Sequence, residues 1–100
     1  MQQVLDAIAN PRRREILRLV WGNERAAGDI AAHFDVSWSA VSQNLRVLRN
    51  AGLVRERRDG TRRFYRAEPE ALGSLEAVLR EMWERDLDTL ASAMERERRG

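Results

Sequence analysis

The chain has 100 residues, of which 43% are hydrophobic and 34% are charged, and its formal net charge is +2. This length fits one small domain with a modest core, and the hydrophobic fraction argues against wholesale disorder. The chain has no cysteine, which excludes disulfides and thiolate metal ligands. There is no signal-peptide core, and no apolar run approaches the roughly 20 residues that span a bilayer. We therefore expect a cytoplasmic protein without membrane contact.

The charge is unevenly distributed. All 18 basic residues are arginine, and residues 51–67 carry a net charge of +4 against −4 for residues 68–100. A concentrated basic segment is typical of nucleic-acid binding, and arginine suits bidentate contacts with phosphate and guanine better than lysine does. Codon bias in a GC-rich genome is the alternative explanation for the lack of lysine.

Two helices are predicted at the start of the chain. A short apolar stripe indicates the first of them: Val4, Leu5 and Ile8. Asn10 and Pro11 predict the start of the second, because Asn caps helices well and Pro is tolerated in the first turn. Gly22 is the expected stop of this second helix.

A third and a fourth helix follow. Residues 26–34 are alanine-rich and predict a short helix, and Ser37 is a good N-cap for a longer one that runs to about Asn50. One face of this fourth helix is an apolar stripe: Val41, Leu45 and Leu48. The opposite face carries hydrogen-bonding side chains: Ser39, Ser42, Gln43, Arg46 and Arg49. Such a face differs from the Glu/Lys mixture of a merely solvated helix.

Residues 53–67 predict a β-hairpin. Asp59-Gly60 at the centre favours a type I′ turn, which requires positive φ angles. Pairing about this turn sets two cross-strand pairs: Val54 with Tyr65, and Arg58 with Thr61. One end of the hairpin is then apolar and its tip is rich in arginine.

Pro69 predicts the start of a last helix that runs to about Arg98. Its apolar residues recur at spacings of three and four: Leu72, Leu75, Leu79, Met82, Trp83, Leu87, Leu90 and Met94. This stripe is longer than one small domain needs to cover, so self-association is expected to bury it. A stripe that serves only the intramolecular core is the alternative.

Together these elements predict a mainly α fold with a small β-hairpin, in the order α-α-α-α-β-β-α. Within one domain, 1–100, a helix-turn-helix covers about 26–50, a wing covers 53–67 and a dimerisation helix covers 69–98. A helix fits the major groove, where Ser, Gln and Arg read base edges, and wing arginines contact phosphates or the minor groove. The alternative is a solvated helix followed by a solvated hairpin.

The segment from Ser37 to Leu48, SWSAVSQNLRVL, with AGLV after it and the hairpin RRDGTRRFY, resembles the ArsR/SmtB family of bacterial repressors. The stretch NPRRREIL, which begins at Asn10, resembles the opening of that family's second helix. The resemblance implies a winged helix-turn-helix that represses transcription as a homodimer, built through the first and last helices. Asn44 stands where the family usually has His, and Trp38 is unusual.

The expected partners are double-stranded operator DNA and a second copy of the chain. The expected DNA-contacting residues are Ser37, Trp38, Ser39, Ser42, Gln43, Arg46, Arg49, Arg58, Arg62 and Arg63. The expected dimer residues are Val4, Leu5, Ile8, Leu75, Leu79, Met82, Trp83, Leu87, Leu90 and Met94.

The resemblance also bears on metals. Many family members sense metals through cysteines at the start of the third helix, where this chain has Ala26 and Gly28. Others use Asp, His and Glu on the last helix. Here that predicted helix has no histidine, and its acids include Glu84, Asp86 and Asp88. Carboxylates alone are poor ligands for soft or borderline metals. We therefore expect no metal and no cofactor, and we expect His33 to cap a helix or lie at the surface.

The sequence bears on three classes of function. An enzyme is disfavoured, since the chain has no Cys nucleophile, no phosphate loop, no second histidine and no evident base for its serines. Two alternatives to a DNA-binding regulator without metal stay open. One is a metal-responsive repressor that uses carboxylates and His33, and the other is a protein-interaction module that has lost DNA binding. An effector ligand is also left open.

Overall fold

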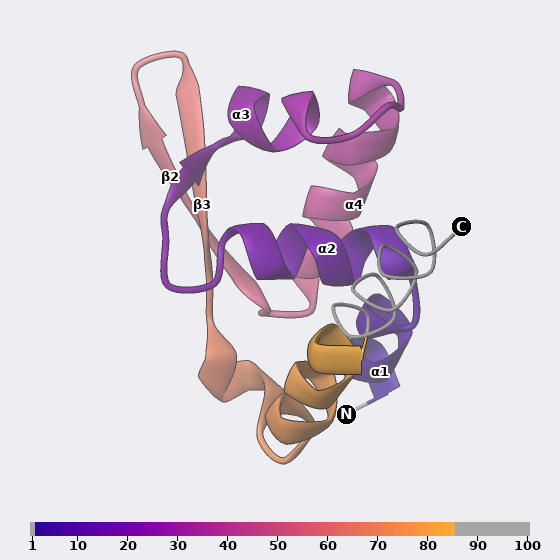
Figure 1. The fold of residues 1–100 in the computed structure, drawn as a ribbon. Coiled ribbons are helices and arrows are strands. Elements are labelled where there is room, and N and C mark those ends of the chain that lie inside the picture. The colour runs from indigo at the N-terminus through magenta and orange to yellow at the C-terminus, as the bar shows by residue number, and fades with distance from the viewer. Residues whose placement is uncertain (1, 86–100) are drawn as a thin grey trace, which may run out of the picture.

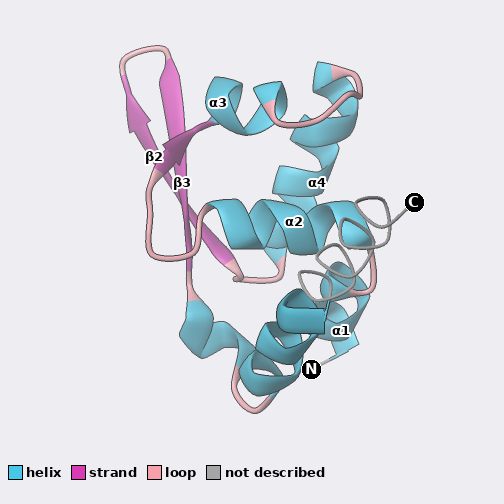
Figure 2. Ribbon diagram, in the orientation of Figure 1, coloured by secondary structure: helices cyan, strands magenta, loops and turns pink. Residues whose placement is uncertain are grey.

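The computed structural model describes residues 2–85 and contains four helices, a three-stranded antiparallel sheet and a further C-terminal helical segment (Figure 1). The helices are α1 (Gln2–Ile8), α2 (Pro11–Leu19), α3 (Ala27–Ala32) and α4 (Trp38–Asn50). The strands are β1 (Arg25–Ala26), β2 (Val54–Asp59) and β3 (Arg62–Ala67), and they are followed by the 3-10 helix η1 (Pro69–Leu72) and by helical residues 75–85. The hairpin of β2 and β3 stands at one side of the helices (Figure 2). The predicted mainly α winged fold is confirmed.

Side-chain caps fix where two of the helices begin. Asn10 Oδ1 accepts hydrogen bonds from the backbone N–H groups of Arg12 at 2.8 Å and Arg13 at 3.2 Å. Ser37 Oγ accepts from the backbone N–H of Ala40 at 3.2 Å. The first N–H groups of a helix have no partner inside it, so these side chains stabilise the predicted starts. The end of α2 differs from the prediction, because it lies at Leu19 rather than near Gly22.

The sheet has a strand that the sequence does not predict. The two-residue β1 pairs antiparallel with β3, so β3 is the central strand in the order β1-β3-β2. Two residues are too few to show an alternating pattern. This pairing ties the base of the hairpin to the residue before α3, and it moves the start of that helix from the predicted residue 26 to Ala27.

The hairpin register also corrects the prediction. The pairs are Val54 with Ala67, Arg58 with Arg63, and Asp59 with Arg62. The two loop residues are therefore Gly60 and Thr61, and only Gly60 has a positive φ, of 63°. A type I′ turn needs positive φ at both positions, whereas glycine at the first position alone fits type II′. The partners shift by two residues, which keeps every side chain on its predicted face.

One hydrophobic core joins the helices to the base of the hairpin. The predicted apolar stripe of α4 is buried, and it packs with buried residues of α2, α3 and β3, such as Ile16, Ile30 and Tyr65. Burying one face of α4 leaves its polar face directed outward, which is the arrangement that positions the candidate site.

The C-terminal part departs from the prediction of one long helix beginning at Pro69. Pro69 instead opens the short η1, and Gly73, with φ of 55°, separates it from helical residues 75–85. Trp83 packs edge-to-face on Trp21 of the loop after α2, with ring centroids 5.1 Å apart. The predicted continuation to residue 98 lies outside the described residues. Within residues 2–85, no helix is both long and apolar enough to cross a membrane.

Candidate nucleic-acid interface

The outward face of α4 presents the polar side chains expected to touch DNA. Ser37, Ser39, Gln43, Arg46 and Arg49 are exposed, and Ser42 is half-buried. Trp38, the first residue of the helix, is 53% exposed, although tryptophan usually packs into a core or an interface. This face therefore combines hydrogen-bonding groups with one large apolar side chain.

Asn44 has a different role from its neighbours on α4. It is buried, with 6% exposure, and its Oδ1 accepts a hydrogen bond from Arg13 Nη1 at 3.4 Å. The same arginine donates to the carbonyl oxygens of Ala7 at 2.7 Å and Asp6 at 2.9 Å. Arg13 thus connects α1, α2 and α4 beneath the polar face. The periodicity of α4 does not reveal this contact, because its partners lie about 30 residues away along the chain.

An open groove of about 520 Å³ brings the two predicted halves of the interface together. It lies between the start of α3, the first turns of α4 and the tip of the wing. Its lining residues are Ala26, Ala27, Gly28, Asp29, Trp38, Ser42, Thr61, Arg62 and Arg63. Four predicted DNA-contacting residues therefore share one concavity: Trp38, Ser42, Arg62 and Arg63. Asp29 is the one carboxylate among the lining residues.

The inner face of the wing is organised around Glu56, a residue that the sequence does not single out. Its carboxylate accepts hydrogen bonds from Tyr65 Oη at 3.0 Å, from Arg49 Nη1 at 3.2 Å and from Arg58 Nε at 3.3 Å. Burial raises the pKa of Glu56, but the Tyr65 and Arg58 hydrogen bonds and the Arg49 and Arg63 charges together hold it below its ordinary value. Burial, and then the Glu56 carboxylate, raise the pKa of Tyr65.

The outer face of the wing carries an arginine pair on an aromatic ring. The guanidinium carbons of Arg57 and Arg62 lie 4.6 Å and 4.9 Å from the ring centroid of Phe64, within cation–π range. Glu24, in the loop before β1, accepts two hydrogen bonds from Arg57, at 2.6 Å and 3.0 Å. This bidentate contact lowers the pKa of Glu24 and raises that of Arg57. Arg57 is therefore occupied within the protein.

Ion pairs within the protein neutralise part of the positive charge of residues 37–66. Four of the eight arginines in residues 37–66 pair with Glu24, Glu56 or Glu68: Arg49, Arg55, Arg57 and Arg58. Two of these acids lie outside the segment, so its net charge of +6 overstates the local excess. The other four arginines form no ion pair with any residue that the structure describes: Arg46, Arg62, Arg63 and Arg66. Three of these four are among the predicted DNA contacts.

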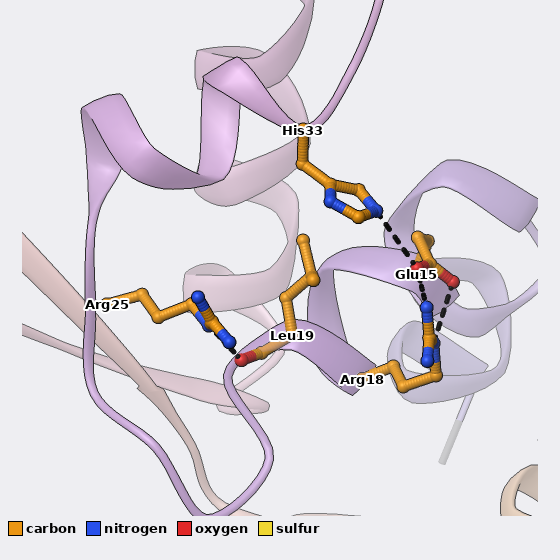
Figure 3. A network of polar contacts seen from close by, with 5 residues as sticks. All are labelled: Glu15, Arg18, Leu19, Arg25 and His33. Atoms are coloured by element: carbon orange, nitrogen blue, oxygen red, sulfur yellow. Dashed lines mark hydrogen bonds and ion pairs between the residues drawn. The ribbon is translucent and has the colours of Figure 1, made fainter.

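A polar network connects the end of α3 to α2 (Figure 3). His33, the C-cap residue of α3, is exposed, and its Nε2 lies 3.3 Å from Glu15 Oε1 on α2. Glu15 also pairs with Arg18, whose hydrogen bond is the main cause that lowers the pKa of Glu15. Arg25 Nε donates to the carbonyl oxygen of Leu19 at 2.7 Å. The predicted surface placement of His33 is confirmed, and among residues 2–85 no cluster of three or more possible metal ligands exists.

The residues predicted for the dimer interface divide into four groups, of which the last lies outside the described residues. Ile8 and Leu79 are buried in the chain's own core, so they have little surface to offer a partner. Leu5 is 41% exposed. Val78, which is not among the residues predicted from the sequence, is 49% exposed. The half-buried members are Val4, Leu75, Met82 and Trp83. The remaining three lie outside the described residues: Leu87, Leu90 and Met94.

A helix-turn-helix whose second helix faces outward, followed by a basic antiparallel hairpin, defines the winged helix-turn-helix class of DNA-binding proteins. The family model of the arsR family of bacterial regulatory proteins matches residues 10–56. The chain belongs to the ArsR family.

Individual relatives agree with this assignment. The chain is 40% identical over 65 residues to the transcriptional repressor SdpR of Bacillus subtilis, covering 65% of this chain and 72% of SdpR. It is 38% identical over 91 residues to the transcriptional regulator Rv2034 of Mycobacterium tuberculosis, covering 91% of this chain and 85% of Rv2034. Among solved structures, it resembles the homodimeric winged helix-turn-helix DNA-binding domain of Mb0332 from Mycobacterium bovis. That match has a TM-score of 0.70 and 37% identity, and it covers 83% of this chain and 77% of the other.

Proposed function

We propose that the chain is a homodimeric repressor that binds a specific duplex operator and blocks access of RNA polymerase to the promoter. The observation that carries the proposal is the shared groove, where the polar face of α4 meets wing arginines that have no described ion-pair partner. A regulator of this kind would act in the cytoplasm, where the bacterial chromosome lies. The helix-turn-helix of about 26–50 and the wing of 53–67 are its DNA-reading parts.

Roles follow from position and chemistry. Ser39, Ser42, Gln43 and Arg46 lie along α4 where side chains reach base edges in the major groove. The N-terminus of the 13-residue α4, with Ser37, offers backbone N–H groups and a positive dipole end to a phosphate. The wing-tip arginines contact phosphates or the minor groove, and Arg62 is the clearest of them, because its guanidinium rests on a ring rather than on a carboxylate.

A dimer matches the symmetry of operators. Two recognition helices related by a two-fold axis enter successive major grooves about 34–36 Å apart. The Mb0332 domain is described as homodimeric and SdpR as a repressor, which supports both parts of the proposal by likeness. In this chain the exposed Leu5 and Val78, with the half-buried Leu75 and Met82, supply apolar surface for a partner from the first and last helices.

The proposal is tested by fluorescence-anisotropy titration of the protein against the duplex upstream of its own gene and against a scrambled duplex of equal length. We expect at least about a 10³-fold preference for the specific site at physiological salt. Equal affinity for the two duplexes, or none for either, would contradict it. A promoter–reporter fusion distinguishes repression, in which deletion of the gene raises expression, from activation, in which deletion lowers it. Adding Zn²⁺ to the titration tests the metal-responsive alternative, which requires the affinity to change.

A further inference from the structure

A carboxylate lies in the middle of the basic surface proposed for DNA. Glu56 is on the inner face of β2, and its side chain is only 12% exposed. A negative charge beside a DNA-binding face opposes attraction to phosphate, and a partly buried carboxylate is costly unless it is well paired. The position of Glu56 therefore needs a compensating role.

The contacts of Glu56 join three elements of the interface. One carboxylate oxygen accepts from Tyr65 on β3 and from Arg49 at the end of α4, and the other accepts from Arg58 on β2. A small cavity of about 60 Å³ between α4 and the hairpin is lined by Glu56 with Arg46 and Arg63. The carboxylate thus fixes two arginines directly and lies beside two more.

We propose that Glu56 is a positioning residue that sets DNA specificity, holding Arg49 and Arg58 as a bound phosphate would and fixing the wing against α4. The inference rests on the proposed DNA-binding function. With Glu56 in place, these two arginines are occupied and are not free to neutralise phosphates of any sequence. The wing is also held at one angle to the recognition helix, and only the correct site benefits from that angle.

The test is Glu56→Gln, which keeps the size of the side chain and much of its hydrogen-bonding capacity while removing the charge. We expect affinity for the scrambled duplex to rise on the order of threefold to tenfold at low salt, with log K falling more steeply against log salt by about one to two units per protomer. The preference for the specific duplex should fall. A uniform weakening on both duplexes, or an unchanged slope and preference, would overturn the proposal.

Asp59→Asn is the matched control, because it removes the same charge from the same segment. Asp59 lies at the exposed wing tip and forms no ion pair with a described residue. We expect its effect on the slope to be clearly smaller than that of Glu56→Gln, whereas equal effects of the two variants would show that only net charge matters and would refute the positioning role.

A second variant covers the case in which Glu56→Gln does not fold, which circular dichroism would show. Tyr65→Phe keeps the buried ring and removes only the hydroxyl that donates to Glu56. We expect a lower specific-over-scrambled ratio with an almost unchanged salt slope, and an unchanged ratio would count against the proposal. If wild-type protein binds neither duplex, the proposed function itself fails. If it binds specifically while the variants behave like wild type, only the role of Glu56 fails.

Discussion

Trp38 offers a sharp test of the groove as a DNA-reading surface. It begins α4, is 53% exposed and lines the groove opposite the wing arginines. Trp21 and Trp83, in contrast, pack edge-to-face against each other. Apolar side chains at the start of a recognition helix contact the 5-methyl group of thymine. We therefore expect Trp38→Ala to weaken specific binding at a temperature where circular dichroism shows that both proteins are folded.

The magnitude follows from the exposed area. A tryptophan that buries up to about 250 Å² in full still exposes roughly 130 Å² here. At about 25 cal/mol per Å², covering all of this area would contribute about 3 kcal/mol. Only part of the free energy calculated from buried area appears as binding free energy, because association also loses motional freedom. We therefore expect a loss of about 1–2 kcal/mol, which corresponds to a Kd that is roughly fivefold to thirtyfold weaker.

The assay is an anisotropy titration of wild type, Trp38→Ala and Trp38→Phe on the specific duplex, repeated with single thymines replaced by uracil to remove one methyl group each. If Trp38 reads a methyl group, one replacement weakens wild type but not Trp38→Ala, and Trp38→Phe lies between the two. Equal losses for Trp38→Ala on specific and scrambled duplexes would refute base contact by this side chain.

Three further predictions concern binding and stability. Gln43→Ala should cost about 1–3 kcal/mol on the specific duplex and relax preference at one base position, so an equal loss on scrambled DNA would remove Gln43 from base reading. Arg62→Ala should reduce the salt slope by about one unit per wing, and an unchanged slope would exclude a phosphate contact. Asn10→Ala should lower the free energy of unfolding in urea by about 1 kcal/mol, because it deletes the cap of α2, and no change would show that the cap is dispensable.

Stability should also depend on Glu15. The hydrogen bond from Arg18 holds the pKa of Glu15 in the folded state below its ordinary value of 4.5. A lowered carboxyl pKa contributes stability that is present above the unfolded value and is lost as pH falls through the folded one. Wild type should therefore lose more stability than Glu15→Gln when urea unfolding is measured at successively lower pH below about 4.5. Parallel losses in the two proteins would contradict this assignment.

The sequence predicts most of what local chemistry determines. The caps at Asn10 and Ser37, the buried stripe of α4 and the existence of the hairpin all follow from short-range patterns. The prediction of the hairpin register was wrong because Asp-Gly and Gly-Thr both make good two-residue turns, and local preference favoured Asp-Gly. The prediction of one unbroken helix from Pro69 was wrong because the apolar spacing continues through Gly73, where the backbone has a positive φ and the helical conformation is interrupted.

Contacts between residues far apart in the sequence could not be predicted from these short-range patterns. The Glu24–Arg57 pair joins residues 33 apart, and Arg13 reaches Asn44 across 31. The role of Glu56 depends on folding that brings Arg49 of α4 against the wing. The polar face of α4 could thus be predicted from the sequence. Which wing arginines form ion pairs with the protein's own carboxylates could not.

Hydroxyl-radical footprinting of the duplex upstream of the gene tests the central claim most directly. If α4 and the wing of a symmetric dimer read the operator, wild type should protect two patches on one face of the duplex, separated by one helical turn of about 10 base pairs. Gln43→Ala should not give this protection pattern at the lowest protein concentration at which wild type saturates the duplex. A single patch, protection spread evenly along every fragment, or an unchanged footprint for Gln43→Ala would contradict it.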